Sequence, residues 1–248
     1  MVDPTHPSTG GVRVKVLMIQ NCDIEGFGLY EQYLVDHGID HSLVRADLDE
    51  LFPPHEEFDA ILIGGTPISA YAAQEYPFLL AEREFLRQAV FDGKACLGTC
   101  CGAQILAQIL GAEVHRCKQM EIGAYRVRLT GAGRRDALLQ DFPHHFPVFH
   151  WHGDTFSVPE AAELLVEGEV CRNQMFRQGK VVGVQFHLEA TSIEAGVWAD
   201  AYRDELVSVG KTSEEVVREC QEYELEMERM AMCLLDNFFE LALDTATG

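Results

Sequence analysis

The most informative part of this 248-residue chain is Ala95-Cys96-Leu97-Gly98-Thr99-Cys100-Cys101-Gly102-Ala103-Gln104. It begins with apolar residues typical of a buried strand, and the segment GAQILAQILG that follows Cys101 has helical spacing and ends at Gly111. Glycines on both sides of Cys100 permit the sharp bend of a strand–turn–helix junction. We therefore expect the Cys100 side chain to stand clear of a sheet at the beginning of a helix.

Strands and helices alternate along the chain around this junction. Val12–Gln20 and Asp59–Ile63 have the composition of strands, whereas Gly28–His37 and Pro77–Phe91 have the spacing of helices. Such alternation is typical of an α/β fold with an open, mostly parallel central sheet that is flanked by helices.

The chain changes character after the junction helix. Short apolar segments predict an additional antiparallel strand region, made of Glu121–Leu129, Val148–Trp151, Leu164–Val166, Cys171–Phe176 and Val181–Phe186. From Ser192 onward the pattern is helical, and Thr212 with Glu215 forms a capping box. We predict a flexible tail over residues 1–11 and a single domain over residues 12–248, with the C-terminal helices of residues 192–248 belonging to it.

Charge and composition exclude several classes of function. The chain carries 40 acidic and 19 basic residues, a formal charge of −21, and a surface of that sign repels nucleic acid and anionic lipid headgroups. Residues 1–11 lack the apolar segment of a signal peptide, and no apolar run approaches the roughly 18–20 residues that cross a bilayer. We expect a cytoplasmic protein that binds neither nucleic acid nor membranes.

The eight cysteines show no paired CxxC spacing of the kind that binds zinc. A disulfide framework is not expected in a cytoplasmic chain of this size. Most of the cysteines are therefore expected to be small buried apolar residues.

Cys100 differs from the other cysteines because of its place at the junction. Unpaired N–H groups and the macrodipole at the beginning of a helix favour a thiolate over a thiol. The neighbouring Cys101 side chain is expected to point elsewhere. Cys100 is thus the candidate nucleophile.

A thiolate nucleophile needs a base, and the segment Val181–Glu189 (VVGVQFHLE) supplies one. Residues two apart on a strand share a face, so Glu189 can lie beside His187 and orient its ring. Donors for a developing oxyanion are expected from the backbone N–H of Cys101 and from the glycine turn at Gly65 and Thr66.

With these residues in place, the sequence resembles the class I (triad) glutamine amidotransferases, and within them the stand-alone branch related to the amidotransferase domain of GMP synthase. The resemblance covers Asp59 to Glu189 and rests on several ordered motifs. These are Gly65-Thr66-Pro67-Ile68-Ser69, Leu97–Gln104, Glu121-Ile122-Gly123, His150–Phe156, Asn173-Gln174-Met175-Phe176 and Gln185–Glu189.

The resemblance implies roles for these residues. It implies Cys100 as the nucleophile, His187 as general base and then acid, and Glu189 as the residue that orients His187. Gln104 matches a residue that contacts the substrate glutamine. Family members hydrolyse glutamine through a γ-glutamyl thioester and release ammonia, and this half-reaction requires no metal or organic cofactor.

The alternating residues His150, His152 and Asp154 also suggest a metal site, because they can share one face of a strand. The resemblance implies instead that this segment forms a wall of the active site and binds no metal. We therefore expect neither a metal nor a cofactor.

Three positions depart from the family pattern. Thr66 stands where a second glycine is usual before proline, which leaves the oxyanion donor open between Gly65 and Thr66. Cys101 stands where leucine is frequent, and Leu188 where proline is frequent. None of these changes removes a catalytic side chain.

Three functions remain open from the sequence. The first is a glutaminase that supplies ammonia from L-glutamine to an acceptor on another polypeptide, since 248 residues suffice for only one large α/β domain. The second is a hydrolase of γ-glutamyl peptides or conjugates, and the third is a catalytically silent regulatory or binding subunit. A separate synthetase and a homodimer are the candidate partners, with Asn21–Gly28 and the helix from Ser213 as partner-facing surfaces.

Overall fold

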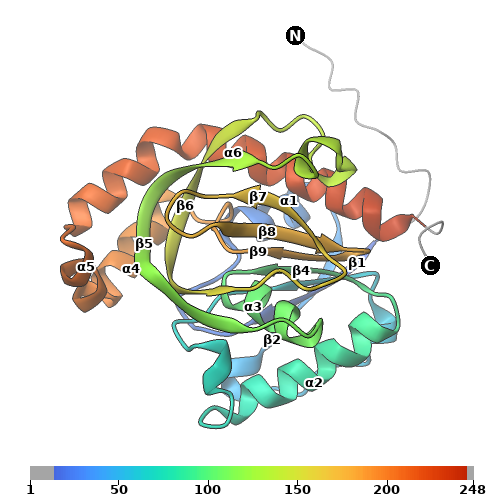
Figure 1. Cartoon of the computed structure of the whole chain (residues 1–248). Coiled ribbons are helices and arrows are strands. Elements are labelled where there is room, and N and C mark those ends of the chain that lie inside the picture. Colours follow the sequence, from blue (N-terminus) through green and yellow to red (C-terminus); the bar gives the residue numbers. More distant parts are fainter. Residues whose placement is uncertain (1–13, 245–248) are drawn as a thin grey trace.

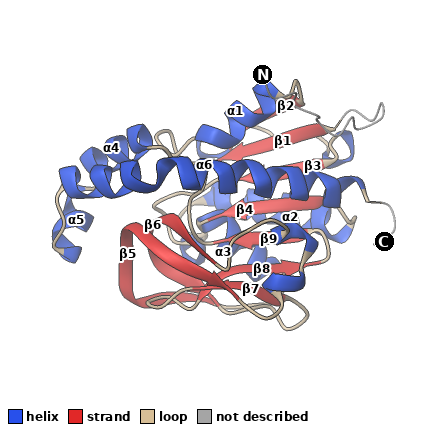
Figure 2. Ribbon diagram, turned by 90° about the horizontal axis from the view of Figure 1, so that it is seen from above, coloured by secondary structure: helices blue, strands red, loops and turns tan. Residues whose placement is uncertain are grey.

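A single mixed sheet runs through the computed structural model, which describes residues 14–244 (Figures 1 and 2). Its nine strands lie in the order β2-β1-β3-β4-β9-β8-β7-β5-β6. The pairs from β2 to β9 in this order are parallel, and the pairs from β9 to β6 are antiparallel. The strands are β1 (Lys15–Gln20), β2 (Asp40–Arg45), β3 (Ala60–Ile63), β4 (Ala95–Thr99), β5 (Val114–Leu129), β6 (His145–Phe156), β7 (Glu163–Glu167), β8 (Asn173–Gln178) and β9 (Val181–Val184).

Helices cover both faces of the parallel half of the sheet (Figure 2). Val16 and Met18 of β1 pack toward α1, α4 and α6, whereas Leu17 and Ile19 pack toward α2 and α3. This alternation follows from the two-residue period of a strand, and it requires apolar residues at all four central positions of β1, Val16–Ile19. The helices are α1 (Gly28–Asp36), α2 (Pro77–Phe91), α3 (Cys101–Ile109), α4 (Ser192–Ala201), α5 (Arg203–Val209) and α6 (Ser213–Leu243).

The long helix α6 begins at the predicted capping box. The Thr212 side chain accepts a hydrogen bond from the Glu215 N–H, and the Glu215 side chain accepts one from the Thr212 N–H. Val216, Cys220 and Leu234 on one side of the helix are fully buried against the sheet. This apolar side of α6 therefore lies in the core of the chain.

The predicted α/β class is confirmed, with two differences in detail. The antiparallel strands continue the same sheet as the parallel ones. Strand β2 was not predicted, because its sequence DHSLVR is mostly polar and only Val44 is buried, so it carries no apolar pattern. The predicted tail of residues 1–11 lies outside the described residues.

Cys117 in β5 and Cys171 before β8 form a disulfide, although a disulfide framework is not expected from the sequence. The two cysteines are 54 residues apart, and the fold brings their Cα atoms to 6.3 Å. A register shift of β5 between Arg116 and Glu121 accompanies this contact. The pairing could not be seen from cysteine spacing because it depends on how distant strands are ordered in the sheet.

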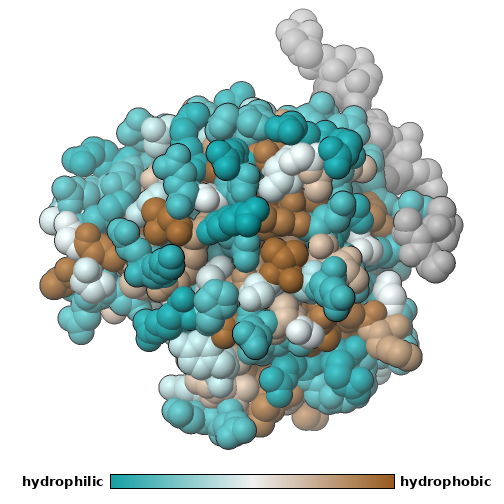
Figure 3. Space-filling model, in the orientation of Figure 1, coloured by the Kyte–Doolittle hydropathy of each residue, from teal (hydrophilic) through white to brown (hydrophobic). Residues whose placement is uncertain are grey.

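The molecular surface is mainly hydrophilic on the face drawn in Figure 3. Figure 3 shows one face, on which hydrophobic residues occur in small groups among more numerous hydrophilic ones. None of the helices in residues 14–244 is both long enough and apolar enough to span a membrane.

Close backbone packing requires two of the glycines in the stretch Ala95–Gln104. A Cβ on Gly102 would lie 2.6 Å from the Ile63 carbonyl oxygen, and a Cβ on Gly98 would lie 2.5 Å from the Gly102 carbonyl carbon. The absence of these two side chains lets α3 begin directly against β3 and β4.

Gly102→Ala is expected to destabilise the protein by about 2–3 kcal/mol, because the added methyl group meets backbone that cannot move aside. The measurement is the free energy of unfolding in urea. Gly131→Ala is the matched control, since its Cβ would have its nearest contact at an ordinary 3.8 Å, to Arg135. Equal stability of the two variants would show that the close approach at Gly102 is not a packing constraint.

Candidate active site

Cys100 lies at the sharp bend between β4 and α3. Its backbone has φ 51° and ψ −110°, a left-handed conformation that non-glycine residues rarely adopt. The Cys100 N–H donates to the Val184 carbonyl oxygen at 2.7 Å, and the Cys100 carbonyl accepts from the Gln104 N–H at 3.2 Å. The bend is thus fixed from both sides, and strain of this kind gathers at functional sites.

His187 follows β9, the strand that pairs directly with β4. Thr99 pairs with Val184 at the carboxyl ends of these parallel strands, so the residues that follow them meet at one edge of the sheet. The His187 N–H donates to the Phe149 carbonyl oxygen at 2.8 Å, and the ring packs edge-on against Trp198. These contacts leave the imidazole one orientation.

Glu189 lies beside His187, although both residues come after the end of β9 and His187 forms only an isolated bridge with Phe149. The His187 Nδ1 and Glu189 Oε1 atoms are 2.5 Å apart, and the two side chains are 2% and 6% exposed. The Glu189 carbonyl oxygen accepts a hydrogen bond from the Leu29 N–H at the beginning of α1. Gly28 permits this approach, since a Cβ there would collide with the same oxygen.

The electrostatic surroundings of His187 favour its charged form. Burial by itself would lower the pKa of the imidazole, but the Glu189 carboxylate and hydrogen bonds with Cys100 and Glu189 outweigh burial. The pKa of His187 is therefore raised well above its ordinary value. An imidazolium beside Cys100 is the arrangement that stabilises a thiolate.

A cavity of about 70 Å³ lies beside Cys100 and His187. Residues from several distant segments surround it, including Glu25, Thr66, Gln104, Asp154 and Tyr202. The cavity gives the sulfur of Cys100 a space in which a small substrate group can be held.

The predicted oxyanion residues lie at this cavity. Thr66 lines it, and a Cβ placed on Gly65 would lie 3.5 Å both from the Cys100 Cβ and from the His187 Cε1. The structure therefore brings the glycine turn next to the cysteine and the histidine. Cys101 begins α3, and its backbone N–H is one of the unpaired groups of the first helical turn.

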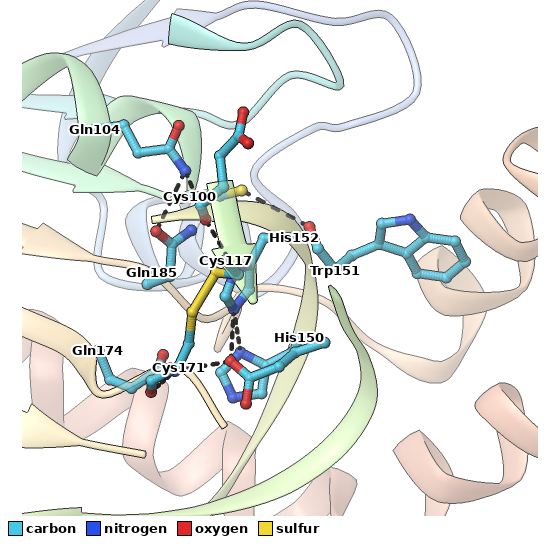
Figure 4. A network of polar contacts seen from close by, with 11 residues as sticks. Cys100, Gln104, Cys117, His150, Trp151, His152, Cys171, Gln174 and Gln185 are labelled. Carbon is cyan, nitrogen blue, oxygen red and sulfur yellow. Dashed lines mark hydrogen bonds and ion pairs between the residues drawn. A yellow bond between two sulfur atoms is a disulfide. The ribbon is translucent and has the colours of Figure 1, made fainter. Parts of the chain in front are cut away.

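The side chains of Cys101 and Gln104 are both buried. The Cys101 thiol donates to the Ile68 carbonyl oxygen at 3.5 Å, and burial raises its pKa well above the ordinary value. The Gln104 amide nitrogen donates to the Asp154 carbonyl and to Gln185 Oε1, both at 3.2 Å (Figure 4). Cys101 is thus an inert thiol in this state, and Gln104 is held at the cavity wall.

Several acidic and aromatic residues of the cavity were not predicted from the sequence. Glu25 is 8% exposed and accepts a hydrogen bond from the Tyr202 hydroxyl at 2.7 Å. Glu205 accepts one from the Trp151 indole N–H, also at 2.7 Å. Burial raises the pKa of Glu25. No pattern in the sequence singles out Glu25, because the same loop also contains Asp23.

Whether Asn21–Gly28 faces a partner stays a prediction, but two of its residues, Asn21 and Glu25, are buried. Asn21 is 1% exposed, and its amide nitrogen donates to Glu82 Oε1 at 2.9 Å. Glu25 lines the cavity. Asn21 and Glu25 point inward because the segment follows β1 at the carboxyl edge of the sheet, where the cavity lies, whereas the Asp23 side chain is exposed.

The three residues considered as a metal set do not converge. Asp154 accepts a hydrogen bond from Ser69 at 2.5 Å and faces the cavity. His150 and His152 turn the other way and lie 3.1 Å from each other, ring nitrogen to ring nitrogen. Their acidic neighbour is Glu121, not Asp154.

The fold and this site define a member of the class I glutamine amidotransferases. The model of the family described as "Glutamine amidotransferase class-I" matches residues 25–198, and the chain belongs to this family. Glutamine hydrolysis with transfer of the released ammonia is the general reaction of the family.

Particular relatives show how far the likeness extends. The glutamine amidotransferase-like protein YfeJ of Salmonella typhimurium is 33% identical over 183 residues, which are 72% of this chain and 77% of YfeJ. The glutamine-hydrolysing GMP synthase of Neisseria meningitidis is 27% identical over 179 residues, which are 68% of this chain but only 33% of that protein. A crystal structure of a glutamine amidotransferase from Thermotoga maritima superposes with a TM-score of 0.86 at 30% identity, covering 94% of this chain and 100% of that one.

Proposed function

We propose that the protein is a glutaminase of the amidotransferase type, in which Cys100, His187 and Glu189 act as a catalytic triad. The observation that carries this proposal is the strained Cys100 at the beginning of α3, which lies beside a buried His187–Glu189 pair. A buried cysteine that only filled the core would not need a left-handed backbone or a charged imidazole next to it.

In the first step the Cys100 thiolate attacks the side-chain amide carbon of L-glutamine. A carbon–sulfur bond forms while the carbonyl electrons move to oxygen, and the N–H groups of Cys101 and of Gly65 or Thr66 stabilise this oxyanion. The oxyanion then collapses and the carbon–nitrogen bond breaks. The proton from His187 goes to the leaving nitrogen, so that ammonia departs and a γ-glutamyl thioester remains.

The second step returns the enzyme to its starting state. His187, now neutral, takes a proton from water, and the resulting hydroxide attacks the thioester carbon. The carbon–sulfur bond breaks, L-glutamate leaves, and the thiolate–imidazolium pair is restored. Throughout, Glu189 holds Nδ1 of His187 so that Nε2 faces the reacting atoms.

The charges of the cavity suggest which end of the substrate it recognises. Glu25, Asp154 and Glu205 line it, whereas no Lys or Arg is among the lining residues in the described part of the chain. A cavity of this sign favours the α-ammonium group of a γ-glutamyl donor. We take Glu25 as its partner, because this buried carboxylate lines the cavity and is held by the Tyr202 hydroxyl.

Glu25→Gln is expected to raise KM for L-glutamine about tenfold or more with a smaller change in kcat, since a charge-assisted hydrogen bond to the substrate is lost. Steady-state kinetics measure this effect, with Glu31→Gln on the exposed side of α1 as the control. N-acetyl-L-glutamine lacks the positive charge. The rise in KM caused by Glu25→Gln should therefore be smaller for N-acetyl-L-glutamine than for L-glutamine. An unchanged KM for L-glutamine would rule out this role for Glu25.

The acceptor of the ammonia is proposed to be bound by a separate synthetase domain or subunit. The chain aligns with 33% of the length of a GMP synthase, so the remaining two thirds of that relative have no counterpart in this alignment.

The direct test is to incubate the protein with L-glutamine and, separately, with γ-glutamyl peptides, and to record the release of ammonia and glutamate. Turnover of glutamine supports the glutaminase. Turnover of the peptides alone would replace it with a γ-glutamyl hydrolase. Lack of turnover together with lack of labelling by a glutamine-analogue electrophile would favour a silent subunit.

A further inference from the structure

A second polar cluster surrounds Nε2 of His152, whereas Nδ1 of the same ring lies near the Asp154 carbonyl oxygen. Figure 4 shows His150 and His152 side by side. His152 Nε2 is 3.1 Å from His150 Nδ1 and 3.1 Å from Glu121 Oε2. The three side chains are buried, with exposures of 0% for His150, 4% for His152 and 2% for Glu121. The proposed glutaminase reaction uses none of them.

The strands fix this arrangement. His150 and His152 are two residues apart on β6 and therefore point to the same face. Glu121 on β5 is the direct partner of His152 in the antiparallel register, which places its side chain on that face as well. The donors are thus set by backbone that cannot easily rearrange.

The charge of Glu121 has little compensation in its surroundings. Within the described residues, no Lys or Arg lies within ion-pair distance of Glu121, whose polar neighbours are His152 and the Gln174 amide nitrogen at 3.0 Å. A buried carboxylate is costly unless it is paired or coordinates a cation. Two imidazoles and a carboxylate are a donor set that suits first-row divalent metals.

The spacing of the donor atoms also fits such an ion. Zinc binds imidazole nitrogen and carboxylate oxygen at about 2.0–2.2 Å, so that two ligands of a tetrahedral site lie roughly 3.3 Å apart. The two 3.1 Å separations are close to this value, and the three donor atoms all lie within 4.8 Å of one another.

We propose that Glu121, His150 and His152 bind a divalent transition-metal ion such as Zn²⁺. The ion has a structural role, because it lies on the far side of His152 from the cavity and joins β5 to β6. His152 Nδ1 lies 3.0 Å from the Asp154 carbonyl oxygen, which also accepts from Gln104. Binding of the ion at Nε2 fixes the tautomer of His152 and steadies this wall of the cavity.

The disulfide Cys117–Cys171 lies on the other side of the same histidine (Figure 4). The Cys117 sulfur is 3.8 Å from His152 Nδ1. When the disulfide is reduced, the two thiols and Nδ1 form a second set of donors that could compete for a metal. The experiment therefore has to distinguish the two sides of His152.

The proposal is tested on the full chain by titration with Zn²⁺ and Co²⁺, with and without a reductant that does not bind metal. We expect one ion per chain in the disulfide-bonded protein, a rise in Tm with Zn²⁺, and a Co²⁺ spectrum of visible d–d bands without a thiolate charge-transfer band. Glu121→Gln and His150→Asn should each weaken binding about 100-fold or more. His145→Asn, at an exposed position of β6, is the control and should bind as the native chain does.

Two outcomes would overturn the proposal. One is that the disulfide-bonded protein binds no Co²⁺, whereas the reduced protein binds Co²⁺ and shows a thiolate charge-transfer band. This outcome would place the metal on the cysteines. The other is no binding at all by a folded native chain, with Tm independent of Zn²⁺, which would leave a hydrogen-bonded network only. Near-ultraviolet circular dichroism of each variant shows whether it is folded, and neither outcome depends on glutaminase activity.

Discussion

Cys100→Ala is expected to reduce glutamine turnover by about 10⁴-fold or more, because the thiolate forms the covalent bond of the proposed mechanism. No other described cysteine occupies the junction between β4 and α3 with a charged imidazole beside it. Ammonia release from L-glutamine, followed with an enzyme-coupled assay, measures the loss. The variant should also fail to react with a glutamine-analogue electrophile.

Cys101→Ala is the matched control for this change. It removes a neighbouring buried thiol but keeps the backbone N–H at the beginning of α3, so activity should stay within a few-fold of the native value. Cys100→Gly supplies a control for folding. Its unfolding free energy is expected to match or exceed that of the native chain, because glycine adopts a positive φ without the strain of cysteine. Retained turnover in Cys100→Ala would remove Cys100 from the mechanism.

Glu189→Gln should have the second largest effect, a loss of about 10³-fold in kcat. The amide is nearly isosteric with the carboxylate, but it carries no charge and can hold His187 in the wrong tautomer. The Glu189 charge raises the pKa of His187, so its removal lowers that pKa. Because the imidazolium form donates the proton to the leaving nitrogen, the alkaline limb of the pH profile of kcat should move to lower pH.

The pH dependence of kcat and of the His187 ring resonances in NMR spectra checks both parts of this prediction. Glu222→Gln on the exposed side of α6 is the control and should leave the profile unchanged. An alkaline limb that stays in place in Glu189→Gln would mean that another group titrates there, and His187 would lose its proposed role as the acid.

Local patterns were sufficient to predict the central geometry. The stretch around Cys100 contained both the strand and the helix, and the two-residue spacing of His187 and Glu189 placed the carboxylate beside the ring. These predictions succeeded because each depends only on neighbours in the sequence. The roles of these residues, together with those of Gly65, Thr66, Cys101 and Gln104, stay predictions that the proposed kinetics address.

Contacts between distant segments escaped prediction. Glu25 is held at the cavity by the hydroxyl of Tyr202, the residue directly after α4 and 177 residues further along the chain. Glu121 joins His152 through the register of β5 and β6, whereas Asp154 had looked equally suitable by spacing alone. Such contacts depend on the order of the strands in the sheet, which cannot be predicted from local periodicity. A homodimer and the division into a tail and one domain likewise stay predictions.

Neighbouring strands β4 and β9 carry the cysteine and the histidine, and this has a consequence for how the protein could be regulated. The Cys100 N–H donates to the carbonyl oxygen of Val184, the last residue of β9, three residues before His187 and in the middle of a nine-stranded sheet. An effector could separate them only by breaking the sheet. Any on–off control must therefore act on the loops that approach this pair from other segments, such as those carrying Gly65 and Glu25, while the pair itself stays assembled between turnovers.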